Sequence, residues 1–360
     1  MMKANKVRSA VLEKNQKIVV KDLPEEELLS FECEVKIKVA GLCSSDISRG
    51  YGASAYSYPL VMGHELAGEI IRVGVDVKDR FSVGDQVCIF PLIPCFNCLS
   101  CKQKFYALCE DYSYFGSRRN GGFAERLNVN QWNLLKIPNG VSIEDCALIE
   151  PTAVALHAVE KLNLKYEERS QICILGAGFI GLMAVQIINL LYPQCKVVIV
   201  DRNQYKLEIG AKYGAITQWV GDTSSWKAFL LQHENRFDNV IELVGSPKTF
   251  SAALHIASQM AYVVWGGNIT GDLALGKSQV SSILRKELTI LGTWNSIYKG
   301  EKSCDWEKTL NLISNGLKPS ELVTSRISLD EIDETLGKFY AHKNRDKEFK
   351  VIKVIVNPNG

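Results

Sequence analysis

The feature that most constrains the fold is a glycine-rich turn that joins a buried strand to an apolar helix. The strand-like segment QICIL is followed by Gly176, Gly178 and Gly181, and an apolar helix-forming run comes next. Gly176 allows a tight turn, Gly178 lets a pyrophosphate approach the backbone, and Gly181 lets the helix pack closely on the strand. The helix N-terminus attracts the phosphate charge. The motif therefore predicts a dinucleotide-binding turn, which includes Phe179 and Ile180.

An acidic residue ends the next expected strand and indicates which dinucleotide binds. The run KVVIV leads into Asp201. A carboxylate at this place can accept hydrogen bonds from both ribose hydroxyls, and it repels a 2′-phosphate. Asp201 therefore favours NAD over NADP, and it favours a cofactor site over a strand–helix turn without a ligand. Arg202 follows immediately and could hold a 2′-phosphate, so NADP is kept as the weaker alternative.

Expected strands and helices alternate around this motif. The strands are KVVIVD, FDNVIELVG, AYVVWGG and ELTILGTW, and QYKLEIGAKYG is one of the helices between them. A further helix is expected over residues 145–162, which carry apolar residues at helical spacing. This alternation predicts an α/β fold with a Rossmann-type, doubly wound parallel sheet that is covered by helices on both faces.

The first 150 residues follow a different pattern and predict a second, β-rich domain. Short runs rich in Val and Ile are separated by turn formers such as Gly, Pro and Asp. A chain of 360 residues is also longer than one hydrophobic core usually organises. We expect a β-rich domain of residues 1–152 and 294–360, to which the tail returns, and a Rossmann domain of residues 153–293. The tail is expected to contain two helices and a final strand.

Charge and composition argue against several classes of protein. A formal net charge of +2 gives no general electrostatic reason to bind nucleic acid or an acidic membrane. The N-terminus lacks the apolar core of a signal peptide. The apolar run over residues 172–192 is long enough to span a bilayer, but glycines break its first half, so we interpret it as a strand, a turn and a helix. We therefore expect a cytoplasmic protein.

The cysteines point to metal binding. The chain has 11 cysteines, and without a secretion signal a disulfide framework is not expected. Four of them form the pattern C-x2-C-x2-C-x7-C, which suits a closed tetrahedral zinc site that stabilises a local fold. This four-cysteine loop consists of Cys95, Cys98, Cys101 and Cys109. An iron–sulfur cluster or a nucleic-acid-binding zinc ribbon are alternatives that the loop alone permits.

A second, dispersed set of residues could hold another zinc ion. Cys43 lies in GLCSSD, His64 and Glu65 lie in VMGHE, and Glu150 lies in LIEPTAV. Each residue is weak evidence by itself, because a buried cysteine or histidine is more often part of a core. Together they offer one sulfur, one nitrogen and one or two oxygen ligands, which fits a catalytic zinc that keeps a position for water or substrate.

The order of these motifs resembles that of the zinc-dependent medium-chain dehydrogenases, over nearly the whole chain. GLCSSD, GHELAGEI, the four-cysteine loop and GAGFIG carry the resemblance. It implies a GroES-like catalytic domain, a Rossmann domain, and a catalytic zinc in the cleft between them. Two zinc ions per chain, a nicotinamide dinucleotide and a homodimer or homotetramer joined through the Rossmann sheets are implied as well.

Glu150 narrows the resemblance to one branch of the family. Classical alcohol dehydrogenases hold the third zinc-ligand position with a cysteine, whereas polyol dehydrogenases, such as sorbitol dehydrogenase, use a glutamate before a proline. Glu150 precedes Pro151, so the chain resembles the polyol branch. By that resemblance Cys43, His64 and Glu150 are ligands of the catalytic zinc, and Glu65 either coordinates directly or exchanges with water.

The same resemblance implies the reaction and the residues that move the proton. The expected activity is the NAD-linked interconversion of a secondary alcohol of a polyol, or of a polyol phosphate, and the ketone. Ser45 stands where the family keeps a relay hydroxyl, and Asp46 is expected to orient a ligand histidine. Many relatives carry a histidine three residues after the relay serine, but this chain has Ser48 there, which leaves the outer relay unassigned.

Two arginines bear on the substrate. The segment GSRRNGG places Arg118 and Arg119 side by side and resembles the members of the branch that act on a polyol phosphate. Paired guanidinium groups bind phosphate oxyanions well, although a solvated surface turn is an equal alternative. A dehydrogenase of free polyols or diols is the nearest rival function. A relative that has lost the catalytic metal is another.

Overall fold

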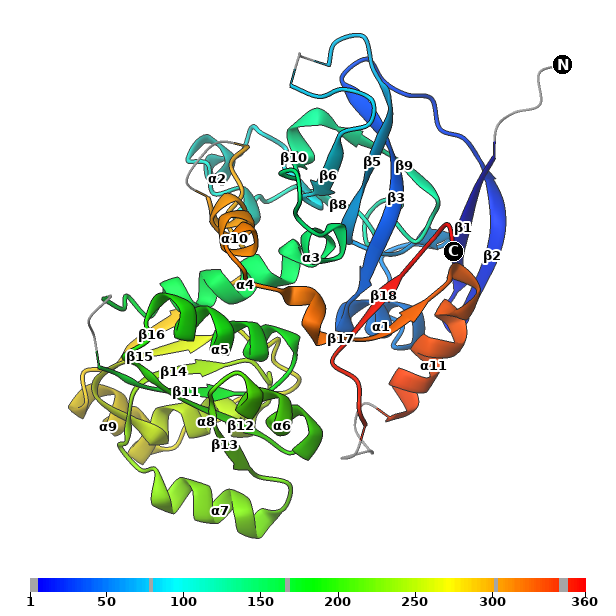
Figure 1. Ribbon diagram of the computed structural model, residues 1–360. Helices are drawn as coiled ribbons and strands as arrows, with labels where there is room; N and C mark the ends of the chain where they lie inside the picture. The colour runs from blue at the N-terminus through cyan, green and yellow to red at the C-terminus, as the bar shows by residue number, and fades with distance from the viewer. Residues whose placement is uncertain (1–5, 78–79, 166–168, 301–303, 343–348) are drawn as a thin grey trace, which may run out of the picture. The chain divides into compact units, whose positions relative to one another are not determined.

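The computed structural model describes most of the chain as two compact units (Figure 1). The described residues are 6–77, 80–165, 169–300, 304–342 and 349–360. The first unit spans residues 1–150, 297–346 and 353–360, and the second spans residues 151–296 and 347–352. The second unit therefore takes in a short stretch of the tail, and the chain returns to the first unit at Lys353.

The first unit is organised around a largely antiparallel sheet. Its strand order is β10-β6-β5-β3-β18-β17, and β9 pairs with the early part of β3. The strands are β3 (Glu32–Leu42), β5 (Glu65–Val73), β6 (Gln86–Ile89), β9 (Arg126–Asn130), β10 (Leu134–Lys136), β17 (Val323–Ile327) and β18 (Lys353–Val356). Buried Val and Ile side chains of β3 and β5, such as Val35, Ile37 and Ile70, supply core contacts, as the apolar runs predict.

Smaller elements complete the first unit. A three-stranded sheet has the order β2-β1-β4, and β7 pairs with β8. The strands are β1 (Lys6–Lys14), β2 (Lys17–Pro24), β4 (Leu60–Val61), β7 (Leu92–Ile93) and β8 (Ser113–Tyr114). The helices are α1 (Ser44–Tyr51), α2 (Leu99–Lys102), α3 (Ile143–Ala147), α10 (Asp305–Ser314) and α11 (Ile332–His342), with short 3-10 helices at Tyr106–Leu108, Gln131–Asn133, Pro319–Leu322 and Leu329–Glu331.

The second unit contains the predicted Rossmann sheet. Its order, β13-β12-β11-β14-β15-β16, is the 3-2-1-4-5-6 order of a doubly wound fold, and all of its pairings are parallel. The strands are β11 (Gln171–Leu175), β12 (Lys196–Asp201), β13 (Ile216–Trp219), β14 (Phe237–Glu242), β15 (Ala257–Trp265) and β16 (Thr289–Gly292). Its helices are most of α4 (Ile149–Glu160), α5 (Phe179–Leu191), α6 (Gln204–Lys212), α7 (Thr223–Gln232), α8 (Pro247–Ile256) and α9 (Lys277–Arg285).

The helix expected over residues 145–162 is two helices. Helix α3 ends at Ala147, and α4 (Ile149–Glu160) begins after Leu148. The reason is Pro151, which has no N–H and whose ring would clash with the carbonyl group of Ala147 in a continuous helix. In the first turn of α4 the same proline is tolerated. The break places Glu150 in the first turn of α4.

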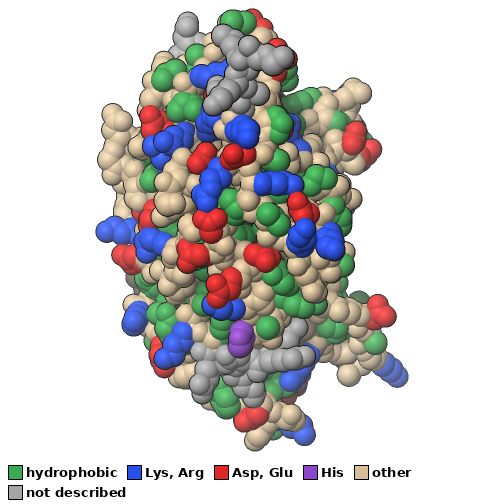
Figure 2. Space-filling model, turned by 90° about the vertical axis from the view of Figure 1, so that its right-hand side faces the viewer, with side chains coloured by type: hydrophobic (Ala, Val, Ile, Leu, Met, Phe, Trp, Pro, Cys, Tyr) green, Lys and Arg blue, Asp and Glu red, His purple; other side chains and the backbone are tan. Residues whose placement is uncertain are grey.

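The described surface carries both signs of charge. Figure 2 shows Lys and Arg side chains interspersed with Asp and Glu side chains over one face. Ion pairs such as Lys17 with Glu13 and Lys38 with Glu69 are examples of this mixing in the first unit. In the part of the chain that the structure describes, no helix is long and apolar enough to cross a membrane.

Candidate active site and metal sites

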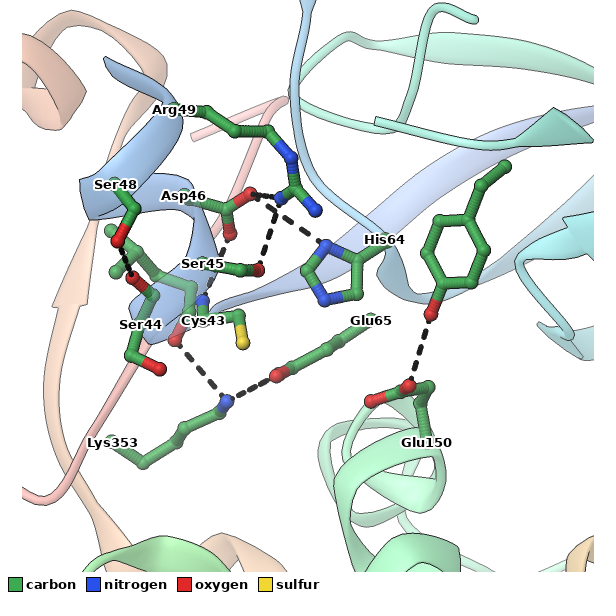
Figure 3. A network of polar contacts seen from close by, with 12 residues as sticks. Cys43, Ser44, Ser45, Asp46, Ser48, Arg49, His64, Glu65, Glu150 and Lys353 are labelled. Atoms are coloured by element: carbon green, nitrogen blue, oxygen red, sulfur yellow. Dashed lines mark hydrogen bonds and ion pairs between the residues drawn. The ribbon is translucent and has the colours of Figure 1, made fainter. Parts of the chain in front are cut away.

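Three of the predicted zinc ligands meet where β3 and β5 lie side by side. Cys43 follows the end of β3, and His64 immediately precedes β5. The strands are antiparallel, with Gly41 directly opposite Glu65, so the two ligand segments face each other. One ligand atom each of Cys43, His64 and Glu65 lies within 4.8 Å of the others. Figure 3 shows these three side chains turned toward one another.

The position of Glu65 requires a glycine on the neighbouring strand. A Cβ atom on Gly41 would lie 1.9 Å from Oε2 of Glu65, so no other residue leaves room for this carboxylate. Glu65 is fully buried, and His64 is 4% exposed. Burying charged or polar groups so completely is costly unless they are paired. Glu65 and His64 therefore need polar partners within the site.

Asp46 is the partner of the Cys43 and His64 segments. It lies in the first turn of α1 and accepts a hydrogen bond from the backbone N–H of Cys43 at 2.9 Å. Its Oδ1 lies 3.6 Å from Nδ1 of His64 and 3.1 Å from the guanidinium group of Arg49. Burial would raise the pKa of Asp46, but His64 and Arg49 hold this pKa below its usual value. Asp46 thus lies where its carboxylate can orient His64.

Cys43 and His64 favour each other's charged forms. Burial would raise the pKa of the Cys43 thiol, but the neighbouring imidazole lowers it. Burial would lower the pKa of His64, but Asp46 and Cys43 raise it well above its usual value. A thiolate sulfur, an imidazole nitrogen and carboxylate oxygen form a donor set that zinc accepts. The residues present therefore fit a zinc ion.

Glu150 lies beside this cluster but not within it. Its carboxylate is not part of the group of ligand atoms that lie within 4.8 Å of one another in the described residues. The side chain is 7% exposed, and its Oε1 accepts a hydrogen bond from the hydroxyl of Tyr114 at 3.1 Å. Burial raises the pKa of Glu150, Glu65 adds to this effect, and His64 opposes it. The carboxylate thus shares the electrostatic environment of the cluster (Figure 3).

Ser45 is held by a residue that sequence reasoning did not single out. Its Oγ accepts a hydrogen bond from Arg49 at 3.0 Å, and the same nitrogen of Arg49 binds Asp46. Ser48, in the place where many relatives carry a histidine, has its Oγ 3.5 Å from the carbonyl oxygen of Ser44. The bond from Arg49 therefore links the candidate relay hydroxyl to the carboxylate that orients His64.

Two further residues of the site were also missed. Tyr114, at the end of β8, binds Glu150 and packs its ring edge-on against His64, with the centroids 5.7 Å apart. Lys353 donates a hydrogen bond to Oε1 of Glu65 at 2.6 Å and another to the carbonyl oxygen of Leu42 at 3.2 Å. The available signal for Lys353 was a charged residue inside the apolar run VIKVIV. For Tyr114 the sequence carries no comparable signal.

The four-cysteine loop gathers its sulfur atoms as predicted from the spacing. The sulfur atoms of all four cysteines lie within 4.8 Å of one another, and none of these four cysteines forms a disulfide. Backbone N–H groups of Glu110 and Cys101 lower the pKa of Cys98 to about 6, and burial raises the pKa of Cys101 to about 12. A compact set of four sulfurs fits a closed tetrahedral zinc site.

The glycine-rich turn has the geometry that the motif predicts. Gly176 has a φ of +109°, which favours glycine, and a Cβ atom on Gly181 would lie 2.0 Å from the carbonyl oxygen of Gly176. A Cβ atom on Gly178, where α5 begins, would meet nothing within 4 Å. Asp201, at the end of β12, accepts hydrogen bonds from the backbone N–H groups of Ala177 at 2.7 Å and Asn203 at 2.8 Å. The open space beside Gly178 fits a pyrophosphate.

The two predicted phosphate-binding arginines have different surroundings. The guanidinium carbon of Arg118 lies 4.4 Å from the ring centroid of Tyr56 and 4.0 Å from that of Tyr112. Its Nη2 also approaches the hydroxyl of Tyr56 at 3.3 Å. Arg119 stacks on Phe115 at 4.9 Å. Arg118 is thus an exposed cation that two aromatic rings hold in place.

The chain combines a β-rich unit that carries a sulfur–nitrogen–oxygen cluster with a Rossmann unit that carries a dinucleotide turn. These features define a metal- and nucleotide-dependent dehydrogenase. Residues 30–139 match the alcohol dehydrogenase GroES-like domain family, and residues 180–315 match the zinc-binding dehydrogenase family. The chain belongs to the zinc-dependent medium-chain alcohol and polyol dehydrogenases. The expected fold class and enzyme class, an oxidoreductase acting on CH–OH groups, are thereby confirmed.

Relatives with assigned activities differ in substrate. Galactitol 1-phosphate 5-dehydrogenase of Escherichia coli K12 is 37% identical over 79% of this chain and 81% of its own length. L-threonine 3-dehydrogenase of Shewanella woodyi is 30% identical over 87% of this chain and 90% of its own length. Family membership therefore does not by itself decide the substrate.

Solved structures show the same architecture. Galactitol-1-phosphate dehydrogenase of Escherichia coli superposes with a TM-score of 0.86 at 32% identity, over 98% of this chain and 100% of the other. Two further dehydrogenases are each 25% identical with TM-scores of 0.85 over 98% of this chain. The superposition covers 100% of the one from Sinorhizobium meliloti, which is bound to NADP. It covers 99% of the one from Escherichia coli CFT073, which is complexed with NADH. Both of these neighbouring structures therefore hold a nicotinamide dinucleotide.

Proposed function

We propose that the chain is a zinc- and NAD-dependent dehydrogenase that interconverts a secondary alcohol of a polyol phosphate and the ketone. The observation that carries the proposal is the buried cluster of Cys43, His64 and Glu65, with Glu150 beside it. The 37% identity to galactitol 1-phosphate 5-dehydrogenase supports the substrate class. A free polyol or diol dehydrogenase is the alternative.

The side chains of the site supply ligands and orientation. Cys43 and His64 offer sulfur and nitrogen, while Glu150 and Glu65 offer carboxylate oxygens. Asp46, whose Oδ1 lies 3.6 Å from Nδ1 of His64, is the residue that we assign to orienting the imidazole ring. Bound zinc would supply Lewis acidity to the substrate hydroxyl, and bound nicotinamide would supply the hydride acceptor.

Ser45 is the residue that we assign to proton transfer. Because Arg49 donates to Oγ of Ser45, the serine's own O–H is left to point toward another acceptor. Its oxygen can then take the proton of the substrate hydroxyl while the serine passes its own proton to solvent water. The cationic Arg49 stabilises negative charge on this oxygen during the exchange.

Arg118 is the residue that we assign to the phosphate. Its guanidinium group is restrained by Tyr56 and Tyr112, so little side-chain entropy is lost when an oxyanion binds. The N–H groups at the edge of the guanidinium plane suit a phosphate. Arg119 contributes a second positive charge next to it in the sequence.

A substrate competition tests this assignment. We expect kcat/KM for galactitol 1-phosphate to exceed the values for galactitol, sorbitol, 2,3-butanediol and L-threonine. Charge-assisted hydrogen bonds contribute about 1.5–3 kcal/mol, so Arg118→Ala should lower kcat/KM for the phosphorylated substrate by about 10- to 100-fold and leave free polyols unchanged. Arg80→Ala is the matched control, because Arg80 also lies over an aromatic ring, that of Phe81, at 5.1 Å. Equal kcat/KM for phosphorylated and free polyols would contradict the phosphate assignment.

A further inference from the structure

The four-cysteine loop lies within a hairpin whose second strand leads to the candidate active site. Strands β7 and β8 pair antiparallel, with Leu92 opposite Tyr114, and residues 94–112 connect them. Each strand has two residues. A hairpin this short is marginally stable at best, and the entropic cost of closing it rises with the length of the connection. The hairpin therefore depends on contacts within or beside the connecting segment.

The first and last cysteines of the loop meet next to this hairpin. The backbone N–H of Cys95 donates a hydrogen bond to Sγ of Cys109 at 3.3 Å. Cys95 follows the end of β7 by two residues, and Cys109 precedes the start of β8 by four. Their sulfur atoms belong to the group of four that lie within 4.8 Å of one another. Ligation of one metal ion by these sulfurs would join both ends of the connection, so that only short segments remain to be closed.

The two strands of the hairpin have different anchors. The side-chain amide of Asn133 donates hydrogen bonds to the carbonyl oxygens of Phe90 and Leu92, both at 2.8 Å, and so holds the β7 side. The β8 side is anchored after Tyr114 by Phe115, which is fully buried. At its other end, β8 leads directly into the four-cysteine loop. The loop therefore governs how firmly the start of β8 is held.

Tyr114 connects this hairpin to the candidate active site. Its hydroxyl group donates a hydrogen bond to Oε1 of Glu150 at 3.1 Å. Its ring packs edge-on against His64, with the ring centroids 5.7 Å apart. One side chain of β8 thus touches two of the expected zinc ligands, and a shift of β8 would disturb both contacts.

We propose that the four-cysteine loop, when it holds its metal, positions the candidate active site by fixing β8 and thereby the side chain of Tyr114. The inference rests on the proposed function and adds that occupancy of the loop site controls turnover. Tyr114 is a positioning residue in this scheme, because it acts through His64 and Glu150. A loop with a purely structural role would stabilise the fold without this route to the site.

The test compares variants of the full chain supplied with zinc. Cys98→Ala removes one ligand of the loop, whereas Cys98→His keeps four, because three cysteines and a histidine also form a structural zinc site. Tyr114→Phe removes the hydroxyl group alone, and a double variant combines it with Cys98→Ala. Tyr51→Phe is the matched control, because the hydroxyl group of Tyr51 also donates to a carboxylate, that of Asp333 at 2.9 Å. The readouts are kcat and the hydrogen exchange of residues 113–116.

The expected results separate positioning from general destabilisation. Cys98→Ala should lower kcat by about 10- to 100-fold and speed the exchange of residues 113–116. The loss should be partial, because Phe115 remains as an anchor. Cys98→His should stay near the wild type. Tyr114→Phe should lower kcat without faster exchange, and the double variant should be no worse than Cys98→Ala, because both changes remove the same contact. Tyr51→Phe should match the wild type.

Three results would overturn the inference alone. One is a Cys98→Ala variant that has lost its loop metal but keeps kcat. Another is a double variant whose losses multiply, which would indicate two independent effects. If Cys98→Ala does not fold, the wild type is measured with a chelator, and exchange of residues 113–116 should then rise together with that of residues 95–109. Protection of residues 113–116 that outlasts that of the loop is the third.

The proposed function fails on a different observation. A wild-type chain that holds zinc in the four-cysteine loop but oxidises none of the tested alcohols with NAD would overturn the proposed function. An active wild type beside an equally active, loop-depleted Cys98→Ala variant would leave the proposed function standing and remove the inference.

Discussion

Three carboxylates of the candidate active site each have a polar partner. Asp46 binds Arg49, Glu65 binds Lys353, and Glu150 binds the hydroxyl of Tyr114. Such hydrogen bonds orient the side chains that could bind the metal. Altering partners of this kind usually lowers metal affinity or activity by roughly 10- to 100-fold. At the scale of single residues, the site is therefore a set of groups whose partners orient them.

Asp201 makes the clearest prediction at this scale. Its carboxylate already organises the glycine-rich turn through the N–H group of Ala177. We expect a higher kcat/KM with NAD than with NADP, because the carboxylate repels a 2′-phosphate. Asp201→Asn should lower kcat/KM with NAD by about 10- to 100-fold, since one charged hydrogen bond contributes about 1.5–3 kcal/mol.

Steady-state kinetics with both cofactors measures this preference. Asp238→Asn is the matched control, because Asp238 also accepts a backbone hydrogen bond, from Gln171 at 2.8 Å, at the opposite end of β11. The control should leave the ratio of the two kcat/KM values unchanged. A wild-type chain that is more efficient with NADP would contradict the role given to Asp201.

The sequence reasoning located sites whose residues are close together in the chain. The glycine-rich turn and the four-cysteine loop are such local motifs, and both have the geometry expected of them. Lys353 lies 288 residues from Glu65, and their contact depends on the pairing of β18 with β3. No periodicity or spacing specifies that pairing. The sequence alone therefore could not indicate the ion pair.

At the scale of elements, the four-cysteine loop lacks a core of its own. Four of its large apolar side chains are at least 49% exposed, namely Phe96, Leu99, Phe105 and Leu108. Little apolar burial is available to hold the segment, so metal ligation has to supply the stability. The loop contains only a four-residue helix, α2, and one short 3-10 helix.

Removal of this metal should therefore unfold the loop before the rest of the chain. We expect Cys98→Ala, or a chelator at equilibrium, to increase hydrogen exchange of residues 95–109 strongly while the Rossmann strands keep their protection. Cys173→Ala is a suitable control, since Cys173 is a buried cysteine of β11. Unchanged exchange in residues 95–109 after the metal is lost would show that the loop does not depend on it.

Helix boundaries show where element prediction reaches its limit. The apolar spacing over residues 145–162 correctly indicated helix, but Pro151 divides the segment into α3 and α4. The parallel strands of the Rossmann sheet were easier to predict from the sequence, because buried strands form continuous apolar runs between helices. The division matters for function, because it sets Glu150 at the start of a helix beside Tyr114.

At the scale of the whole molecule, the family accounts for the architecture, and individual side chains carry the specificity. The chain shares its fold with dehydrogenases of different substrates, and a fold does not by itself assign a substrate. The features that favour a polyol phosphate here are local ones, chiefly the aromatic-stacked Arg118. All of the proposed chemistry presupposes a second zinc ion at Cys43 and His64.

The zinc content of the purified chain tests that central claim most directly. We predict two zinc ions per chain in the wild type and one in Cys43→Ala, with the remaining ion held by the four-cysteine loop and with turnover abolished. A wild-type chain with one zinc ion, or a Cys43→Ala chain that keeps two ions and near-normal kcat, would contradict the account.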